Sequence, residues 1–162
     1  MRHSHPAGRF LWRNLPIAAI GLGLVCGVPS LKWLGPADPG APESDQWYFK
    51  GNLLAGQNRL DEAIDAFENA QRLSPKNADV YFALGSIWSR KGEWREAEVS
   101  FADFVKRQPK DWEGWLLLGN CRERLGDVAG ARAAYWNAAH LDPGSLKVQE
   151  AIRRLGDQSQ KR

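Results

Sequence analysis

Few side chains of this sequence could act as nucleophiles, general bases or metal ligands. The cysteines are Cys26 and Cys121, and the histidines are His3, His5 and His140. Two neighbouring imidazoles make an incomplete metal site, because zinc takes at least three protein ligands. The sequence shows no Ser-His-Asp or Cys-His arrangement, no phosphate-binding glycine loop and no Cys/His metal spacing. We therefore expect no enzymatic activity, no metal and no cofactor.

The remaining reactive groups are better explained as structural side chains. Cys121 falls in a helical pattern, where a free cysteine behaves as a small buried hydrophobe. His140 comes near the end of a predicted helix, where it suits the helix dipole. Asp61 and Asp65 are four residues apart on one helix surface, so we expect them to be solvated.

The distribution of charge argues against a nucleic-acid partner. The net charge is +3, but residues 44–145 hold slightly more acidic than basic side chains. The basic surplus lies at the two ends of the chain. A domain that binds nucleic acid needs a basic face, since phosphate neutralisation supplies much of the affinity.

An uncharged apolar run occupies residues 15–31. As a helix it would be about 26 Å long at 1.5 Å per residue, slightly short of a bilayer core of about 30 Å. Trp12 and Trp33 bracket the run, as tryptophans at membrane interfaces do. An uncleaved anchor, a cleaved signal peptide and a buried helix are the open interpretations. No small-x-small cleavage site follows the run, which favours the anchor.

The anchor interpretation predicts three segments and an orientation. They are a basic tail at 1–14, a transmembrane or signal-anchor segment at 15–34 and a Pro/Gly linker at 35–43. Three arginines precede the span, whereas only Lys32 closely follows it. The positive-inside rule then keeps the N-terminus in the cytoplasm and sends the rest of the chain to the periplasmic or lumenal side.

From residue 44 the sequence repeats with a period of 34 residues, in three gapless blocks at 44–77, 78–111 and 112–145. Aromatic residues recur at positions 4 and 24, glycine at 8, alanine at 20 and proline at 32 of each block. These residues are Trp47, Tyr81, Trp115, Phe67, Phe101, Tyr135, Gly51, Gly85, Gly119, Ala63, Ala97, Ala131, Pro75, Pro109 and Pro143. Each block predicts two helices by its apolar spacing, with close crossings at the small residues.

The repeated residues resemble the tetratricopeptide-repeat (TPR) family. The resemblance implies an all-α, right-handed solenoid of three helix-turn-helix repeats, with a concave face formed by the first helix of each pair. Asn58, Gly92 and Gly126 occupy the predicted turns, where a left-handed conformation is needed. We predict a capping helix at 146–156, ended by Gly156, and a disordered tail at 157–162, which makes seven helices in the repeat region.

Three residues depart from the repeat. Lys50 stands where Leu84 and Leu118 stand in the later blocks, so it faces solvent or covers apolar surface with its stem. Phe104 replaces a small residue, so it either displaces a helix or fills a gap. Arg122 replaces an apolar residue, which weakens that face of the third repeat or provides a polar contact.

The resemblance also implies where a partner would bind. TPR proteins commonly hold partner segments on positions 2, 5, 9, 12 and 13 of each repeat. Positions 5, 9 and 13 are Tyr48, Asn52 and Gly56, then Phe82, Ser86 and Arg90, then Leu116, Asn120 and Arg124. A chaperone-type carboxylate clamp would have a lysine in place of Tyr48. The alternative is that Tyr48 and Phe82 only pack and the arginines are solvated.

These observations favour a membrane-anchored adaptor that assembles or stabilises a multi-protein complex. Its partner would be a protein, through a peptide segment or a subunit of a membrane complex, and its N-terminal helix would hold it to the membrane. Two alternatives are a small permanent structural subunit of a membrane complex and a secreted soluble TPR module released by signal cleavage.

Overall fold

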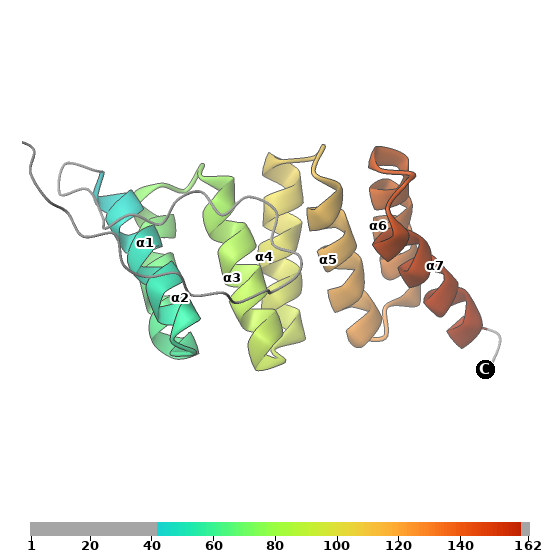
Figure 1. Cartoon of the computed structure of the whole chain (residues 1–162), viewed down its shortest axis with the longest axis horizontal. Helices are drawn as coiled ribbons and strands as arrows, with labels where there is room; N and C mark the ends of the chain where they lie inside the picture. The colour runs from blue at the N-terminus through green and yellow to red at the C-terminus, as the bar shows by residue number, and fades with distance from the viewer. Residues whose placement is uncertain (1–41, 160–162) are drawn as a thin grey trace, which may run out of the picture. The chain divides into compact units, whose positions relative to one another are not determined.

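The computed structural model describes residues 42–159, which form seven α-helices (Figure 1). The helices are α1 (Glu43–Gly56), α2 (Leu60–Leu73), α3 (Ala78–Lys91), α4 (Trp94–Arg107), α5 (Trp112–Arg124), α6 (Val128–Leu141) and α7 (Leu146–Ser159). The predicted all-α solenoid of three helical pairs and a seventh helix is confirmed for this part of the chain. We call α1–α2, α3–α4 and α5–α6 hairpins 1, 2 and 3.

The predicted N-terminal tail, the span at 15–34 and most of the linker lie outside the described residues. Trp12, Trp33, Cys26 and the two N-terminal histidines therefore stay sequence predictions. Within residues 42–159, no helix has both the length and the apolar character that crossing a bilayer requires.

The helix boundaries follow from the turn residues that the sequence singled out. Asn58, Gly92 and Gly126 have φ angles of 60°, 82° and 82°, the left-handed conformation that reverses the chain between the helices of a hairpin. The second helix of each hairpin ends two residues before a proline, which cannot continue a helix. Asn77 caps α3 by accepting a hydrogen bond from the Asp79 amide.

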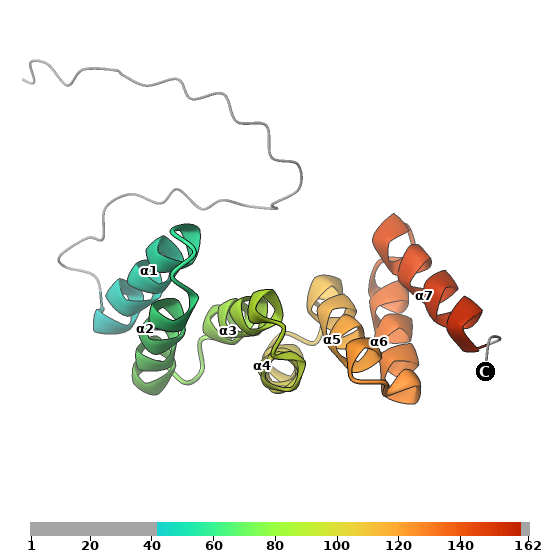
Figure 2. The ribbon, with the colours of Figure 1, turned by 90° about the horizontal axis from the view of Figure 1, so that it is seen from below.

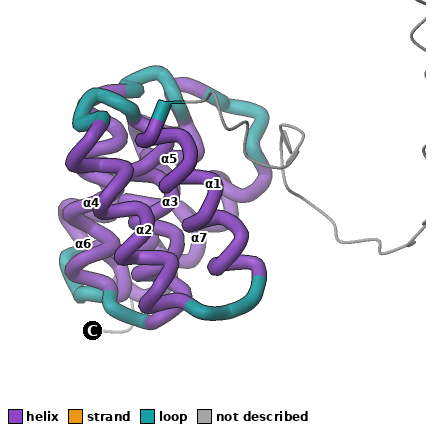
Figure 3. Tube along the Cα trace, turned by 90° about the vertical axis from the view of Figure 1, so that its left-hand side faces the viewer, coloured by secondary structure: helices purple, strands orange, loops and turns teal. Residues whose placement is uncertain are grey.

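The helices stack in chain order, and the odd and even helices lie on opposite sides of the stack. Each hairpin contacts the next through α2 and α3, then α4 and α5, and α7 packs on α6. The odd helices also contact one another, α1 with α3 and α5 with α7. Figures 2 and 3 show α1, α3, α5 and α7 along one side and α2, α4 and α6 along the other.

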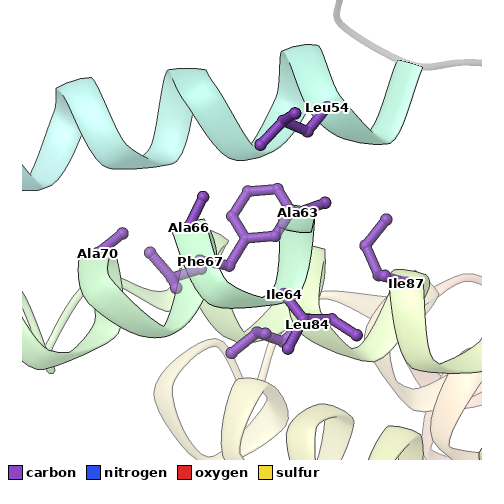
Figure 4. Packing of buried hydrophobic residues seen from close by; sticks show 9 residues of the cluster. Leu54, Ala63, Ile64, Ala66, Phe67, Ala70, Leu84 and Ile87 are labelled. Carbon is purple, nitrogen blue, oxygen red and sulfur yellow. The ribbon is translucent and has the colours of Figure 1, made fainter. Parts of the chain in front are cut away.

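Each hairpin is closed by an aromatic ring that lies against a glycine. A Cβ on Gly51 would be 2.6 Å from Phe67, one on Gly85 2.9 Å from Phe101, and one on Gly119 2.4 Å from Tyr135. The glycine therefore creates the space that the ring fills, as the repeat predicts. Figure 4 shows the first of these rings between α1 and α2, surrounded by the apolar residues of hairpin 1 and α3.

The three departures from the repeat each have a structural explanation. Lys50 is exposed, with Nζ 4.6 Å from the Trp47 ring centre, because no hairpin precedes α1 in the described stack. Phe104 is buried, and Gly114 provides the gap that it fills, since a Cβ there would be 2.4 Å from the Phe104 ring. Arg122 provides a polar contact, because its Nε lies 2.9 Å from Glu98 Oε1.

The predicted end of the capping helix was wrong. α7 continues through Gly156 to Ser159, so residues 157–159 are helical and not part of a disordered tail. Glycine ends a helix when it adopts a positive φ, and Gly156 is not among the positive-φ residues of the described chain. Inside a helix, glycine only lowers stability, by about 1 kcal/mol relative to alanine.

Candidate partner-binding face

The predicted partner-binding residues come from α1, α3 and α5, and we call the side of the stack that these helices form the odd-helix face. Tyr48 and Phe82 are half-buried on it, so each ring is only partly available. The centre of the Tyr48 ring lies 5.5 Å from that of the Phe67 ring, and the centre of the Phe82 ring lies 5.1 Å from that of the Phe104 ring. The cores of hairpins 1 and 2 therefore fix the position of both aromatic side chains.

Tyr48 also connects the first two hairpins electrostatically. Burial raises the pKa of its phenol, while a hydrogen bond with Asn52 acts in the opposite direction. The carboxylate of Asp79, in the first turn of α3, raises the same pKa further, and α1 and α3 contact each other in the stack. The ionisation of Tyr48 in hairpin 1 therefore depends on a charge in hairpin 2.

Ser86 and Gly56 occupy the same face but offer little to a partner. The Ser86 hydroxyl donates to the Phe82 carbonyl at 2.8 Å, inside its own helix. Gly56 is exposed at the end of α1, and a Cβ there would contact nothing.

Leu116 was wrongly assigned to the binding groove. It is 6% exposed and belongs to the buried cluster that includes Tyr135 of α6 and Val148 of α7. The side chain is shorter than those of Tyr48 and Phe82 at the equivalent positions, and the apolar cluster encloses it. It stabilises the end of the stack and presents very little surface to a partner.

Asn120 belongs to a hydrogen-bond network that the sequence analysis missed. Arg154 of α7 reaches across to α5, where Nε and Nη2 donate to the Glu123 carboxylate at 2.9 and 2.8 Å. Nη2 also lies 3.2 Å from Asn120 Oδ1. The Tyr135 hydroxyl donates to Glu123 at 2.6 Å and lies 2.9 Å from Asn120 Oδ1.

This network changes the ionisation of its members. Burial, followed by the hydrogen bond to the Glu123 carboxylate, raises the pKa of Tyr135. The Glu123 side chain is 9% exposed, so its paired arginine offsets a substantial desolvation cost. The only sequence signal for the network was tyrosine at position 24, where the first two blocks have phenylalanine.

Arg90 and Arg124 are exposed, as expected, but both already make contacts. Arg90 donates to the Ala55 carbonyl at 3.1 Å and to Asn58 Oδ1 at 3.0 Å. It therefore connects hairpin 2 to the C-terminal end of α1, where a cation is favoured. The guanidinium of Arg124 lies 5.0 Å from the centre of the Trp94 ring.

Position 2 of each block adds a row of acidic residues that the sequence analysis did not single out. Asp45, Asp79 and Glu113 lie in the first turns of α1, α3 and α5. Negative charge is favourable there because of the helix dipole. The odd-helix face therefore has carboxylates near the N-terminal ends of its helices and arginines near the C-terminal ends of α3 and α5.

The reactive side chains within the described residues have structural surroundings. Cys121 is buried, its Sγ lies 3.8 Å from Ser89 Oγ, and burial raises its thiol pKa. His140 lies in the last turn of α6, as predicted. Among residues 42–159, no group of three or more His, Cys, Asp or Glu is arranged to hold a metal ion.

Two family models match the chain. One, described as a TPR repeat, covers residues 51–92, and one described as a tetratricopeptide repeat covers residues 89–145, so together they span more than half of the sequence. The chain belongs to the tetratricopeptide-repeat family. Its TPR domain is therefore a protein-protein interaction module.

Named relatives share the repeats over part of their length. Tetratricopeptide repeat protein 33 of Mus musculus is 31% identical over 100 residues, which cover 62% of this chain and 38% of the relative. Its Homo sapiens counterpart is 29% identical, over 67% of this chain and 41% of the relative. The chain thus spans about two fifths of the length of these relatives. The human protein O-mannosyl-transferase TMTC1 is 28% identical over 114 residues, which cover 68% of this chain and 13% of that relative.

Solved structures show the same fold. The first TPR of Spaghetti (RPAP3), bound to the HSP90 peptide SRMEEVD, has a TM-score of 0.68 and 21% identity, covering 72% of this chain and 92% of that one. The Sgt2 TPR domain from Aspergillus fumigatus has a TM-score of 0.67 and 22% identity, covering 75% and 82%. At these identities the likeness establishes the fold of the repeats.

Proposed function

We propose that this protein is a membrane-anchored TPR adaptor that holds a segment of a partner protein on the odd-helix face. The observation that carries the proposal is the arrangement on that face. Two half-buried aromatic rings, Tyr48 and Phe82, are fixed by their own cores and lie among polar and charged side chains. Rigid aromatic anchors with neighbouring charges are typical of surfaces that bind protein segments.

The same face favours one chemistry of partner. Apolar side chains of an extended or helical segment would contact Tyr48 and Phe82, while basic side chains would meet the row of Asp45, Asp79 and Glu113. The Spaghetti TPR binds an HSP90 peptide, and the second TPR domain of human RPAP3 an HSP70 peptide, both ending in EEVD. Here Tyr48 replaces the expected lysine, and the negative charge of Asp79 acts on that position, which disfavours an acidic C-terminus.

The membrane part of the proposal rests on the sequence of the N-terminal segment. Residues 15–31 are uncharged and apolar, Trp12 and Trp33 flank them, and basic residues precede them. We propose that this segment spans the membrane once with the N-terminus in the cytoplasm. The TPR domain would then assemble or stabilise a protein complex on the periplasmic or lumenal side.

Site-specific photo-crosslinking tests the partner-binding face. A photoreactive side chain at Asn52 on the odd-helix face is compared with one at Val99, which is 60% exposed on α4 of the opposite side. The full-length chain is irradiated in cells, and adducts are identified by mass spectrometry. We expect one recurrent protein adduct from position 52 and none from position 99. The same adduct from both positions, or from position 99 alone, would refute the face assignment.

Membrane extraction tests the anchor separately. Carbonate-washed membranes should retain the full-length protein, and deletion of residues 1–34 should release it. A reporter active only outside the cytoplasm, fused after Arg162, should be active. A washed-off protein that begins after Gly27 would instead support the secreted alternative. Stoichiometric co-purification with one membrane complex through detergent would favour a permanent subunit over an adaptor.

A further inference from the structure

A hollow of about 210 Å³ lies between α6 and α7, and none of its lining residues comes from α1, α3 or α5, the helices that define the odd-helix face. Tyr135 and Leu155 are almost fully buried and form its base, whereas Trp136 and Ile152 are 67% and 37% exposed at its sides. The residues lining it are Arg132, Tyr135, Trp136, Ile152, Leu155 and Gly156. A Cβ at Gly156 would contact nothing, so the hollow has no side chain there to cover it.

The size and lining of the hollow suit a single side chain. Small-molecule pockets are typically about 300–1,000 Å³, so this one is too small for a drug-sized ligand. Apart from Arg132, the atoms available to a partner are mainly those of apolar and aromatic side chains. Tryptophan and arginine are both among the residue types enriched where a few side chains dominate the binding energy of a protein interface.

The one charged side chain among the residues that line the hollow is Arg132, which is basic. Arg132, Trp136 and His140 recur every four residues along α6, so they share one exposed face of that helix. The sequence of α6 contains no Asp or Glu. In α7, at about 100° per residue, Glu150 and Asp157 leave the helix about 100–160° away from Ile152 and Gly156, and neither is among the residues that line the hollow.

A second copy of the chain fits this surface poorly. In a two-fold symmetric dimer the same patch meets itself, which would bring two Arg132 side chains together across an apolar contact. A further helical hairpin is also disfavoured. In register with the repeats, Arg153 takes the position of Gly51, Gly85 and Gly119, where a following helix needs the space that glycine leaves.

We propose that the hollow between α6 and α7 is a second docking site, which takes one bulky apolar side chain from an acidic segment of a partner protein. Trp136 and Ile152 contact the inserted side chain, and Arg132 pairs with a carboxylate next to it. The site is separate from the odd-helix face, so one chain can hold two segments of different charge.

A library of random 12-residue peptides displayed on phage tests this site. Immobilised full-length protein is used for selection, and the Trp136→Ala variant is used for counter-selection. Peptides that survive should combine one large apolar residue with flanking Asp or Glu. Trp136→Ala should weaken the selected peptides at least about tenfold and Arg132→Glu at least about fivefold, in fluorescence polarisation with the synthetic peptides.

Matched controls come from α4. Val99→Ala and Arg95→Glu remove an exposed apolar and an exposed basic side chain from the same side of the stack, and each should change affinity less than about twofold. Positions 95, 99, 132 and 136 are all exposed, so the thermal unfolding midpoint of each variant should equal that of the unmodified protein. Failure to recover such peptides, or equal binding to the Trp136→Ala variant, would overturn the proposal. A dimer that Trp136→Ala dissociates would also overturn it, because a second copy would then occupy the hollow. None of these results bears on crosslinking from Asn52.

Discussion

The contact between Gly51 and Phe67 gives a quantitative test of how a hairpin closes. A Cβ at position 51 would lie 2.6, 2.7 and 2.9 Å from Cε1, Cδ1 and Cζ of the ring. Carbon atoms prefer at least about 3.5 Å, so ring and helix must separate by about 0.9 Å at the nearest atom. Phe67 is 1% exposed and its neighbours surround it, so the ring cannot move into free space.

Gly51→Ala therefore has two opposing effects. Overpacking costs about 1–3 kcal/mol, while alanine favours the helix by about 1 kcal/mol over glycine. We expect a net loss of about 1 kcal/mol in the free energy of unfolding, measured by urea denaturation with far-ultraviolet circular dichroism. As a control, Gly156→Ala should raise that free energy by up to about 1 kcal/mol, because a Cβ there meets nothing.

The double mutant tests the cause of the loss. Phe67→Leu alone should destabilise the protein by about 1–2 kcal/mol, because it leaves a cavity. Since leucine also vacates the volume that the new Cβ needs, Gly51→Ala should cost at least about 0.5 kcal/mol less in the Phe67→Leu background. If the two losses simply add, the ring is not the obstacle and the proposed glycine-ring mechanism of closure is wrong.

Three further predictions concern other parts of the repeat region. The raised pKa of Tyr135 means that the folded state holds the phenol proton more tightly than the unfolded state does. The contribution of this proton to the free energy of unfolding is therefore complete below pH of about 10, and it is lost as the pH rises through the folded pKa. Tyr135→Phe should reduce the loss of stability between pH 9 and 11 seen in urea titrations; an unchanged alkaline slope would contradict this. Gly92→Ala should lower the unfolding free energy by about 1 kcal/mol, since φ is 82° there and the space is open; a stabilised variant would exclude the left-handed turn. Lys50→Leu should promote self-association in sedimentation velocity, because Leu84 at the equivalent position packs on the preceding hairpin; a monomer at high concentration would count against Lys50 as a solubilising end residue.

The sequence by itself determined the helices, their pairing and the hairpin closures. These features depend on local spacing, since a turn needs a left-handed residue at one position and a crossing needs a small residue opposite a large one. Asn58, Gly92 and Gly126 were therefore predictable as turns, and Gly51 and Phe67 as a crossing. The pattern also predicted Cys121 as buried, and the resemblance to the TPR family implied that the first helix of each pair forms one face of the stack.

Only the tertiary structure decided which side chains on that face are available. Arg90 bonds to Asn58, 32 residues away, and Arg154 bonds to Asn120, 34 residues away, so both contacts join neighbouring repeats. Position within a repeat fixes which way a side chain leaves its helix. It does not fix whether the next helix in the stack covers that side chain, as it does Leu116, or hydrogen-bonds to it, as it does Asn120. The hollow beside Trp136 has the same origin, because it exists only where α7 packs against α6.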